Sequence, residues 1–110
     1  MDREQIFGDM DILVVTSEME GRSLAIMEAM AHQVAVVATD IGGNTQLVRD
    51  GRTGMLFPYA DPDALAGVLN RLFTDGALRC RLATEARRVA CEELSLELSA
   101  KVLDTLYWPG

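Results

Sequence analysis

"ILVVTSEMEGRSLAIMEAMAHQVAVVA", residues 12–38, holds two short apolar runs on either side of a helix-forming segment. The runs, Ile12–Val15 and Val34–Ala38, are rich in β-branched residues and show no alternation of apolar and polar positions. This pattern is typical of parallel strands that are covered on both faces. The segment between them, residues 22–33, is full of Leu, Ala, Met and Glu, which favour helix. The stretch therefore predicts a strand, a helix and a parallel strand.

The next part of the chain extends this unit. A third apolar run, Met55–Phe57, follows a glycine-containing loop, a short helical stretch and a turn at Asp50-Gly51. The order β-α-β-α-β implies right-handed crossovers and a doubly wound α/β sheet of about three parallel strands. A parallel sheet this narrow would leave Ile12–Val15 as an apolar edge, which is a liability.

The rest of the chain is predicted to be helical. One helix begins with Asp61 as the N-cap and Pro62 at the first helical position. A second helix covers residues 76–93, and a third follows with Ser95 as its N-cap. At 110 residues, the chain is expected to form one domain, residues 1–110.

Composition narrows the classes of function. The chain is 49% hydrophobic and 25% charged, which fits a globular protein, and it has no apolar run of the roughly 20 residues that a membrane span needs. A net charge of −7 argues against nucleic acid as a partner. The one basic cluster lies among glutamates, which predicts a solvated helix face; it comprises Arg79, Arg81, Arg87 and Arg88.

The cysteines and the histidine suggest a reducing compartment and no metal site. Cys80 and Cys91 fall in one predicted helix, three turns apart, which is too far for a disulfide. With no secretory signal visible, two unpaired thiols indicate a cytoplasmic protein. His32 is the only histidine, so no metal-binding set of residues is expected, and His32 itself fits a surface or capping position.

The loop that follows the first strand is the candidate site. Ligands bind at the carboxyl ends of strands in open α/β sheets. A helix beginning near Arg22 or Ser23 would offer free N–H groups and a partial positive charge to a phosphate, and Gly21 would let the backbone approach it closely. Neither the GxGxxG motif nor a Walker A lysine is present, so dinucleotide and P-loop chemistry lack their sequence motifs.

Two glutamates flank this helix start, with seven residues between them. Glu20 would lie at the mouth of the site and Glu28 about a turn and a half into the helix. A carboxylate accepts paired hydrogen bonds from vicinal hydroxyls, so each suits a ribose or a hexose. The alternatives are that Glu20 is a solvated loop acid or complements the helix dipole, and that Glu28 is an exposed helix residue.

Several short motifs in a fixed order carry a family resemblance. They are Glu20-Gly21, "EAMA" at 28–31, "VVAT" at 36–39, "GG" at 42–43 and "DGRTG" at 50–54. From about Asp11 to about Tyr107 the chain resembles the donor-binding half of GT-B glycosyltransferases of the GT4-like retaining group. The resemblance implies a partial Rossmann-like C-terminal domain of the GT-B fold, with flanking helices and a helical C-terminus.

The resemblance also implies roles for individual residues. Glu28 corresponds to the glutamate that binds the ribose hydroxyls of the nucleotide, and Glu20 to the catalytic-site glutamate that faces the transferred sugar. Backbone amides at Gly21, Arg22, Ser23 and Leu24 would contact the sugar and the diphosphate. No metal and no cofactor is implied beyond the nucleoside-diphosphate sugar, which is the donor substrate.

Four positions depart from the family pattern. Arg22 stands where a large apolar residue is common, Ala35 where proline is frequent, and Gln46 where a glutamate is frequent. Gln33 replaces a helix-ending glycine, so a residue with a side chain is expected in the left-handed conformation, at a cost of about 1 kcal/mol.

The chain resembles only the second half of the family's donor domain. The acceptor domain and the first half of the donor domain have no counterpart in it. We therefore expect the family reaction, transfer from a nucleoside-diphosphate sugar with retention, to require more than this chain, which alone would be inactive. The alternative is a non-catalytic assembly module or a remnant that pairs with a separately encoded partner or with itself, by strand addition at the open edge. Members of the family often transfer sugars to lipid-linked acceptors. The resemblance therefore implies a cytoplasmic protein that can act at the membrane surface.

Overall fold

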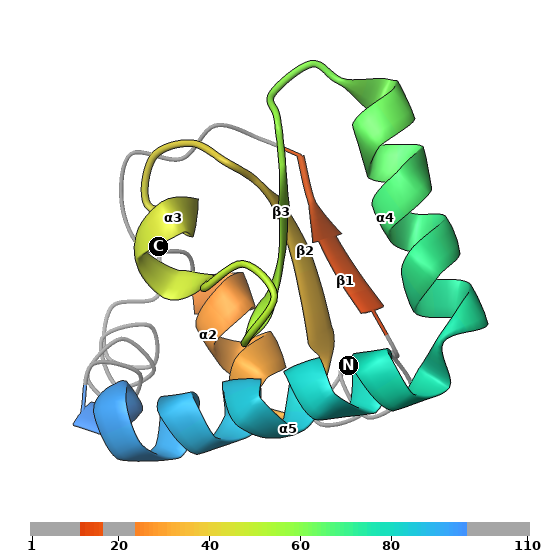
Figure 1. The fold of residues 1–110 in the computed structure, drawn as a ribbon. Coiled ribbons are helices and arrows are strands. Elements are labelled where there is room, and N and C mark those ends of the chain that lie inside the picture. The colour runs from red at the N-terminus through yellow and green to blue at the C-terminus, as the bar shows by residue number, and fades with distance from the viewer. Residues whose placement is uncertain (1–11, 17–23, 97–110) are drawn as a thin grey trace, which may run out of the picture.

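The computed structural model describes residues 12–16 and 24–96 of the chain (Figure 1). Its centre is a parallel sheet in the order β1-β2-β3, formed by β1 (Ile12–Val15), β2 (Ala35–Thr39) and β3 (Gly54–Phe57). The prediction of three parallel strands is confirmed. The second strand lies one residue later than predicted, and the third begins one residue earlier.

Four helices surround this sheet: α2 (Leu24–Ala31), α3 (Asn44–Leu47), α4 (Pro62–Thr74) and α5 (Gly76–Glu93). Figure 1 shows α2 and α3 on one side of the sheet and α4 on the other, while α5 crosses beneath both. Of the predicted third C-terminal helix, residues 95–96 are helical, and the remainder lies outside the described residues.

The two faces of the sheet bury separate hydrophobic clusters. Val36 and Ala38 pack into the cluster with α2 and the later half of α5. Val37 packs into the cluster with α4 and the first turns of α5. Because β2 contributes to both clusters, all five of its residues are buried. The prediction of a strand covered on both faces is therefore correct for β2.

The edge strand β1 does not meet that prediction. Its residues are half-buried, and Val14 is 38% exposed, although the strand is entirely apolar. Val14 lies beside Val37 in the parallel register, so it belongs to the face that α4 covers. Within the described residues β1 pairs only with β2, which leaves the apolar edge that the sequence predicted.

The predicted start of α4 is confirmed, whereas Ser95, predicted as an N-cap, is already helical. The Asp61 carboxylate accepts a hydrogen bond from the Ala64 amide at 3.0 Å, and Pro62 is the first residue of α4. Asp75 caps α5 in the same way, accepting from the Leu78 amide at 2.9 Å. The sequence carries the same signal here, an aspartate directly before a helix-forming segment, so this cap was also predictable.

The end of α2 has the geometry expected of a helix-ending glycine, with glutamine in its place. Gln33 has φ of 60°. The Val34 amide donates to the Ala29 carbonyl at 2.9 Å, and the Gln33 amide donates to the Met30 carbonyl at 3.1 Å, which is the Schellman pattern. The expectation of a left-handed residue at position 33 is confirmed.

Candidate functional site

The carboxyl ends of the three parallel strands meet along one edge of the sheet. In Figure 1 this edge is at the top, where β1 leads toward α2, β2 leads to α3, and β3 leads to α4. Ligands of open α/β sheets bind at this edge. The candidate site is therefore the edge formed by the strand ends and the first residues of the helices that follow.

Two of the six predicted site residues are described in the structure. Leu24 is the first residue of α2 and is half-buried. Glu28 is the fifth, so its backbone lies roughly 6 Å along the helix axis from Leu24, at about 1.5 Å rise per residue. The other four predicted residues, Glu20, Gly21, Arg22 and Ser23, lie outside the described residues.

Glu28 is only 7% exposed. The alternative of an exposed helix residue is therefore wrong for this position. The helix α2 is buried continuously from Ile26 to Met30, so Glu28 is close to the ligand edge and is also surrounded by core residues. A carboxylate is costly to bury unless its environment compensates it. Burial alone fits either a ligand-binding or a structural glutamate.

A hollow of about 280 Å³ lies at the same edge, on the side of the sheet that carries α4. It is lined by Thr16, Thr39, Phe57, Tyr59, Ala60, Asp61, Pro62 and Leu65. The lining is largely apolar, with two threonine hydroxyls and an exposed tyrosine, a mixture that is common in ligand pockets. Leu24 and Glu28, the two predicted site residues that the structure describes, are not among its lining residues. A possible signal in the sequence is that Thr16 and Thr39 each directly follow an apolar run.

The loop between β2 and α3 is held firmly at this edge. The Asp40 amide donates to the Phe57 carbonyl at 2.8 Å, which ties the loop to the end of β3. Asn44, at the start of α3, is fully buried, and its side-chain amide donates to the carbonyl and hydroxyl oxygens of Thr39 at 3.2 and 3.0 Å. Gln46, where a glutamate is frequent in the family, is exposed on α3.

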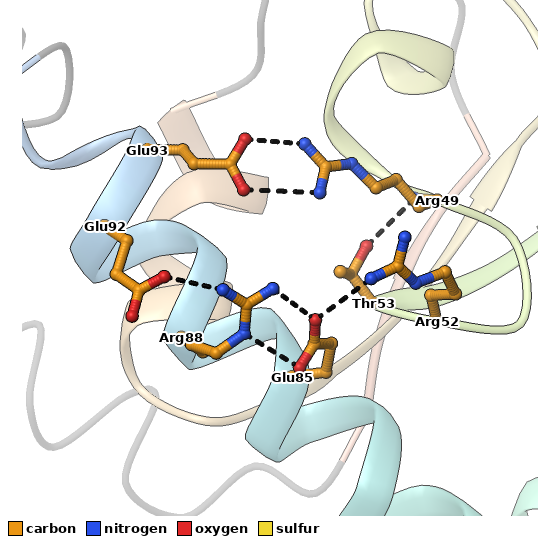
Figure 2. Close-up of polar contacts among 7 residues, drawn as sticks. All are labelled: Arg49, Arg52, Thr53, Glu85, Arg88, Glu92 and Glu93. Carbon is orange, nitrogen blue, oxygen red and sulfur yellow. Dashed lines mark hydrogen bonds and ion pairs between the residues drawn. The ribbon is translucent and has the colours of Figure 1, made fainter.

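The "DGRTG" motif lies at the opposite, amino-terminal end of β3 and contacts α5 (Figure 2). Arg49 donates two hydrogen bonds to Glu93, at 2.7 and 3.3 Å, and this lowers the pKa of the Glu93 carboxyl. Arg88 and Arg52 both donate to the Glu85 carboxylate. They lower the pKa of the Glu85 carboxyl, and the hydrogen bond from Arg88 has the largest effect. Arg49 and the motif that follows it therefore contact α5 at the end of the sheet opposite the candidate site.

The basic residues of α5 were predicted to form a solvated helix face, and this is confirmed for three of the four. Arg81, Arg87 and Arg88 are exposed, and Arg88 is ion-paired with Glu85 and Glu92. The exception is Arg79, which is half-buried and donates to the Leu72 carbonyl at 2.8 Å.

The remaining sequence features contribute no site in the described part of the chain. Cys80 and Cys91 are free and exposed on α5, and His32 is half-buried at the end of α2. Residues 12–16 and 24–96 contain no group of histidine, cysteine and carboxylate side chains that could hold a metal ion. No helix within the same ranges is long and apolar enough to cross a bilayer.

Comparison with known sequences identifies relatives of one kind. The family described as "Glycosyl transferases group 1" matches residues 1–75. A glycosyltransferase 1 domain-containing protein 1 of Xenopus tropicalis is 37% identical over 94 residues, and a D-inositol 3-phosphate glycosyltransferase of Salinispora arenicola is 39% identical over 90 residues. These matches cover 86% and 82% of this chain, but they span only 27% and 20% of the relatives.

Comparison with solved structures also finds a group 1 glycosyltransferase. The Anabaena protein Alr3699/HepE, solved in complex with UDP-glucose, matches 97% of this chain with a TM-score of 0.82 and 27% identity, over 30% of its own length. The C-terminal domain of the group 1 glycosyltransferase LpcC from Francisella tularensis matches 81% of this chain with a TM-score of 0.74 and 29% identity, over 46% of the solved chain. The matched region is therefore of the C-terminal, Rossmann-like type.

Proposed function

Because this chain belongs to the group 1 glycosyltransferases, the GT4 group with the GT-B fold, we propose that it binds a nucleoside-diphosphate sugar at the carboxyl edge of its sheet. The observation that carries the proposal is Glu28, a carboxylate that is 7% exposed and lies within the first turn and a half of α2 at this edge. The complex of Alr3699/HepE with UDP-glucose supports the choice of ligand class.

In this proposal each predicted residue has a role. Glu28 accepts hydrogen bonds from the ribose hydroxyls, and Glu20 faces the transferred sugar as the catalytic-site residue. The diphosphate lies against the start of α2, where backbone amides from Gly21 to Leu24 and the helix dipole stabilise its charge. The same charge stabilisation favours departure of the nucleoside diphosphate, which is an electrostatic form of catalysis that needs no metal.

We further propose that the chain is a single partial donor domain and that transfer with retention belongs to a longer assembly. The relatives are several times longer than the matched region, which leaves room for an acceptor domain and for the first half of the donor domain. The isolated chain should then show little or no transfer of radiolabelled sugar. Robust turnover would contradict this part of the proposal. The exposed, free thiols Cys80 and Cys91 support a reducing, cytoplasmic location, which includes the cytoplasmic membrane surface.

The test of binding is a titration of the ¹⁵N-labelled chain with UDP, GDP and ADP, followed by NMR. At least one nucleotide should shift the backbone amides of residues 24–28. Glu28→Ala should weaken the binding of that nucleotide about tenfold or more, because a hydrogen-bonded charged group is lost. Glu92→Ala serves as a control, since this exposed carboxylate lies on α5, away from the edge.

The titration also distinguishes the two parts of the edge. Shifts confined to Phe57, Tyr59 and Leu65 would show that the nucleotide occupies the hollow beside α4, and would reject the assignment of Glu28. No shift with any of the three nucleotides would reject donor binding by this chain.

A second candidate function is an assembly module, and the edge strand favours it. Among the described residues β1 is paired on one side only, and its apolar side chains are half-buried where those of β2 are fully buried. A separately encoded partner or a second copy could add a strand along this edge. Size-exclusion chromatography tests the idea: a complex or self-association supports it, and a monomer at all concentrations contradicts it.

A further inference from the structure

The hollow beside α4 offers about 280 Å³ of space at the carboxyl edge of the sheet, and the proposed nucleotide site leaves it unused. Ligand pockets typically measure roughly 300–1,000 Å³, so this hollow suits a single ring better than a whole nucleotide sugar. Among the described residues, its lining includes no lysine or arginine. A phosphate group would therefore find no charged partner there.

The rim of the hollow presents an exposed aromatic ring on a stiff loop. Tyr59 is 61% exposed, and the loop that carries it lies between Pro58 and Pro62, each of which fixes its own φ. The next residue, Ala60, takes φ of 58°, a conformation that alanine adopts rarely. Strained residues of this kind cluster at binding sites, where the surrounding structure holds them in place. A loop already fixed in this way loses little freedom when a ligand binds.

Polar groups stand on two sides of the same hollow. On the side of α4, the Asp61 carboxylate accepts one hydrogen bond from the Ala64 amide at 3.0 Å. A carboxylate has about four acceptor positions, so Asp61 can cap the helix and still accept from a ligand. On the side of the strands, Thr16 and Thr39 each contribute a hydroxyl. The Thr39 hydroxyl is buried and accepts from the Asn44 side chain, whereas Thr16 is exposed.

A sugar ring matches this combination of groups. One face of a pyranose is largely C–H and packs on an aromatic ring as apolar surface does. Its hydroxyls, spread around the ring, supply donors for a carboxylate on one side and partners for a hydroxyl on the other. A wholly apolar ring would cover the Asp61 carboxylate without giving it a hydrogen bond, which is costly. An anionic ring would be repelled by the same carboxylate.

We propose that the hollow beside α4 binds a pyranose that is not part of the nucleotide donor. One face of the ring packs on Tyr59, and its hydroxyls donate to the Asp61 carboxylate and bond to the Thr16 hydroxyl. This inference goes beyond the proposed function and does not depend on Glu28.

The first test is a titration of the ¹³C,¹⁵N-labelled chain with methyl α-D-glucopyranoside, followed by NMR. The amides of Ala60 and Leu65 and the ring of Tyr59 should shift and reach saturation, with a dissociation constant on the order of millimolar for so small a ligand. Glycerol has hydroxyls but no ring, and should cause no saturable shift at the same concentrations. Saturating UDP should leave the affinity for the glucoside unchanged.

Several results of this titration would overturn the inference. They are the absence of a saturable shift, an equal response to glycerol, shifts confined to residues 24–28, and a response of the hollow to uridine instead of the glucoside. A response to UDP-glucose alone would also overturn it, because the ring would then belong to the donor. The proposed function fails separately: it fails if UDP, GDP and ADP leave residues 24–28 unshifted, whatever the glucoside does.

The second test uses variants with matched controls. Asp61→Ser keeps an N-cap at the start of α4 but removes the carboxylate, so it should weaken glucoside binding about tenfold. Asp75→Ser makes the same change at the start of α5, outside the hollow, and should leave binding unchanged. Tyr59→Ala should weaken binding about threefold to tenfold, and Tyr59→Phe, which keeps the ring, should weaken it less. Phe73→Ala removes an exposed ring of α4 that does not line the hollow, and should have no effect.

Unchanged affinity for the glucoside in folded Asp61→Ser and Tyr59→Ala would overturn the inference. Urea unfolding shows which variants are folded. If a variant does not fold, the titration of the unmodified chain decides.

Discussion

Gln33 ends α2 in the conformation that glycine adopts most readily, with φ of 60°. Its side chain contributes something that glycine cannot: Nε2 donates to the Thr84 hydroxyl at 3.2 Å, and Oε1 accepts from Arg87 at 3.4 Å. Both contacts are exposed, so they are expected to offset only part of the backbone strain of about 1 kcal/mol.

Two substitutions at Gln33 separate these effects. Gln33→Ala keeps the strain and loses the contacts with α5, whereas Gln33→Gly loses the contacts and relieves the strain. In urea unfolding, the glycine variant should be more stable than the alanine variant by about 1 kcal/mol. Equal stability of the two variants would mean that the left-handed conformation costs little here.

Gly54 is a second residue whose backbone surroundings decide its identity. A Cβ at this position would come within 2.5 Å of the Val36 carbonyl oxygen and 2.9 Å of a methyl group of Val48. Gly54→Ala should therefore destabilise the fold by about 1–3 kcal/mol, as overpacked cores do. Gly67→Ala is the matched control: a Cβ there meets nothing within 4 Å in α4, so the helix should gain about 0.5–1 kcal/mol. Thermal unfolding of both variants checks the opposite signs.

These residues show what sequence could predict at this scale. The strain at Gln33 followed from the family pattern, because one residue at a known helix end had changed. The third apolar run begins at Met55, yet β3 also includes Gly54, whose backbone passes close to the Val36 carbonyl of β2. The hydrogen bonds from Asn44 to Thr39 depend on the folded loop between them, and no local pattern reveals them.

At the level of elements, α5 is joined by ion pairs to Arg49, just before the "DGRTG" turn, and to Arg52 within it (Figure 2). Hydrogen bonds from Arg49 lower the pKa of Glu93, and those from Arg88 lower the pKa of Glu85. A carboxylate with a lowered pKa in the folded state adds stability above its unfolded pKa. This stability is lost as the pH falls through the folded pKa.

The resulting prediction concerns the pH dependence of stability. Glu93→Gln should be less stable than the unmodified chain at neutral pH, and the difference should disappear as the pH falls below about 4.5, the ordinary glutamate pKa. The effect should be small and sensitive to salt, because the pair is exposed. Urea unfolding at a series of pH values measures it. A difference that stayed constant down to low pH would contradict the role of the charged pair.

The elements themselves were largely predictable, but the contacts between them were not. The strands followed from short apolar runs, and the start of α4 from Asp61 and Pro62. The bond between Arg49 and Glu93 joins residues 44 apart in sequence. Many such surface pairs are compatible with one sequence, so only the packing of α5 against the turn selects this one.

For the whole molecule, the sequence predicted the order and the parallel direction of the three strands, and the proposed site at their carboxyl edge follows from that arrangement. It did not predict the hollow beside α4, because that space depends on how the first turn of α4 faces the ends of all three strands. It also left the burial of Glu28 open, since a glutamate in a helix is usually exposed. Both features arise from the packing of distant segments around β2.

The open edge of β1 yields the last prediction. Val14 is 38% exposed on the side of the sheet that α4 covers, whereas Phe73 is 67% exposed on α4. If the assembly hypothesis is right, Val14→Lys should abolish self-association or partner binding, because a charge on an edge strand opposes strand addition. Phe73→Lys makes the same change in charge and should not abolish it. Light scattering coupled to size exclusion, over a range of concentrations, gives the mass of each variant, and equal loss of association in both would indicate general hydrophobic contact instead of a defined edge.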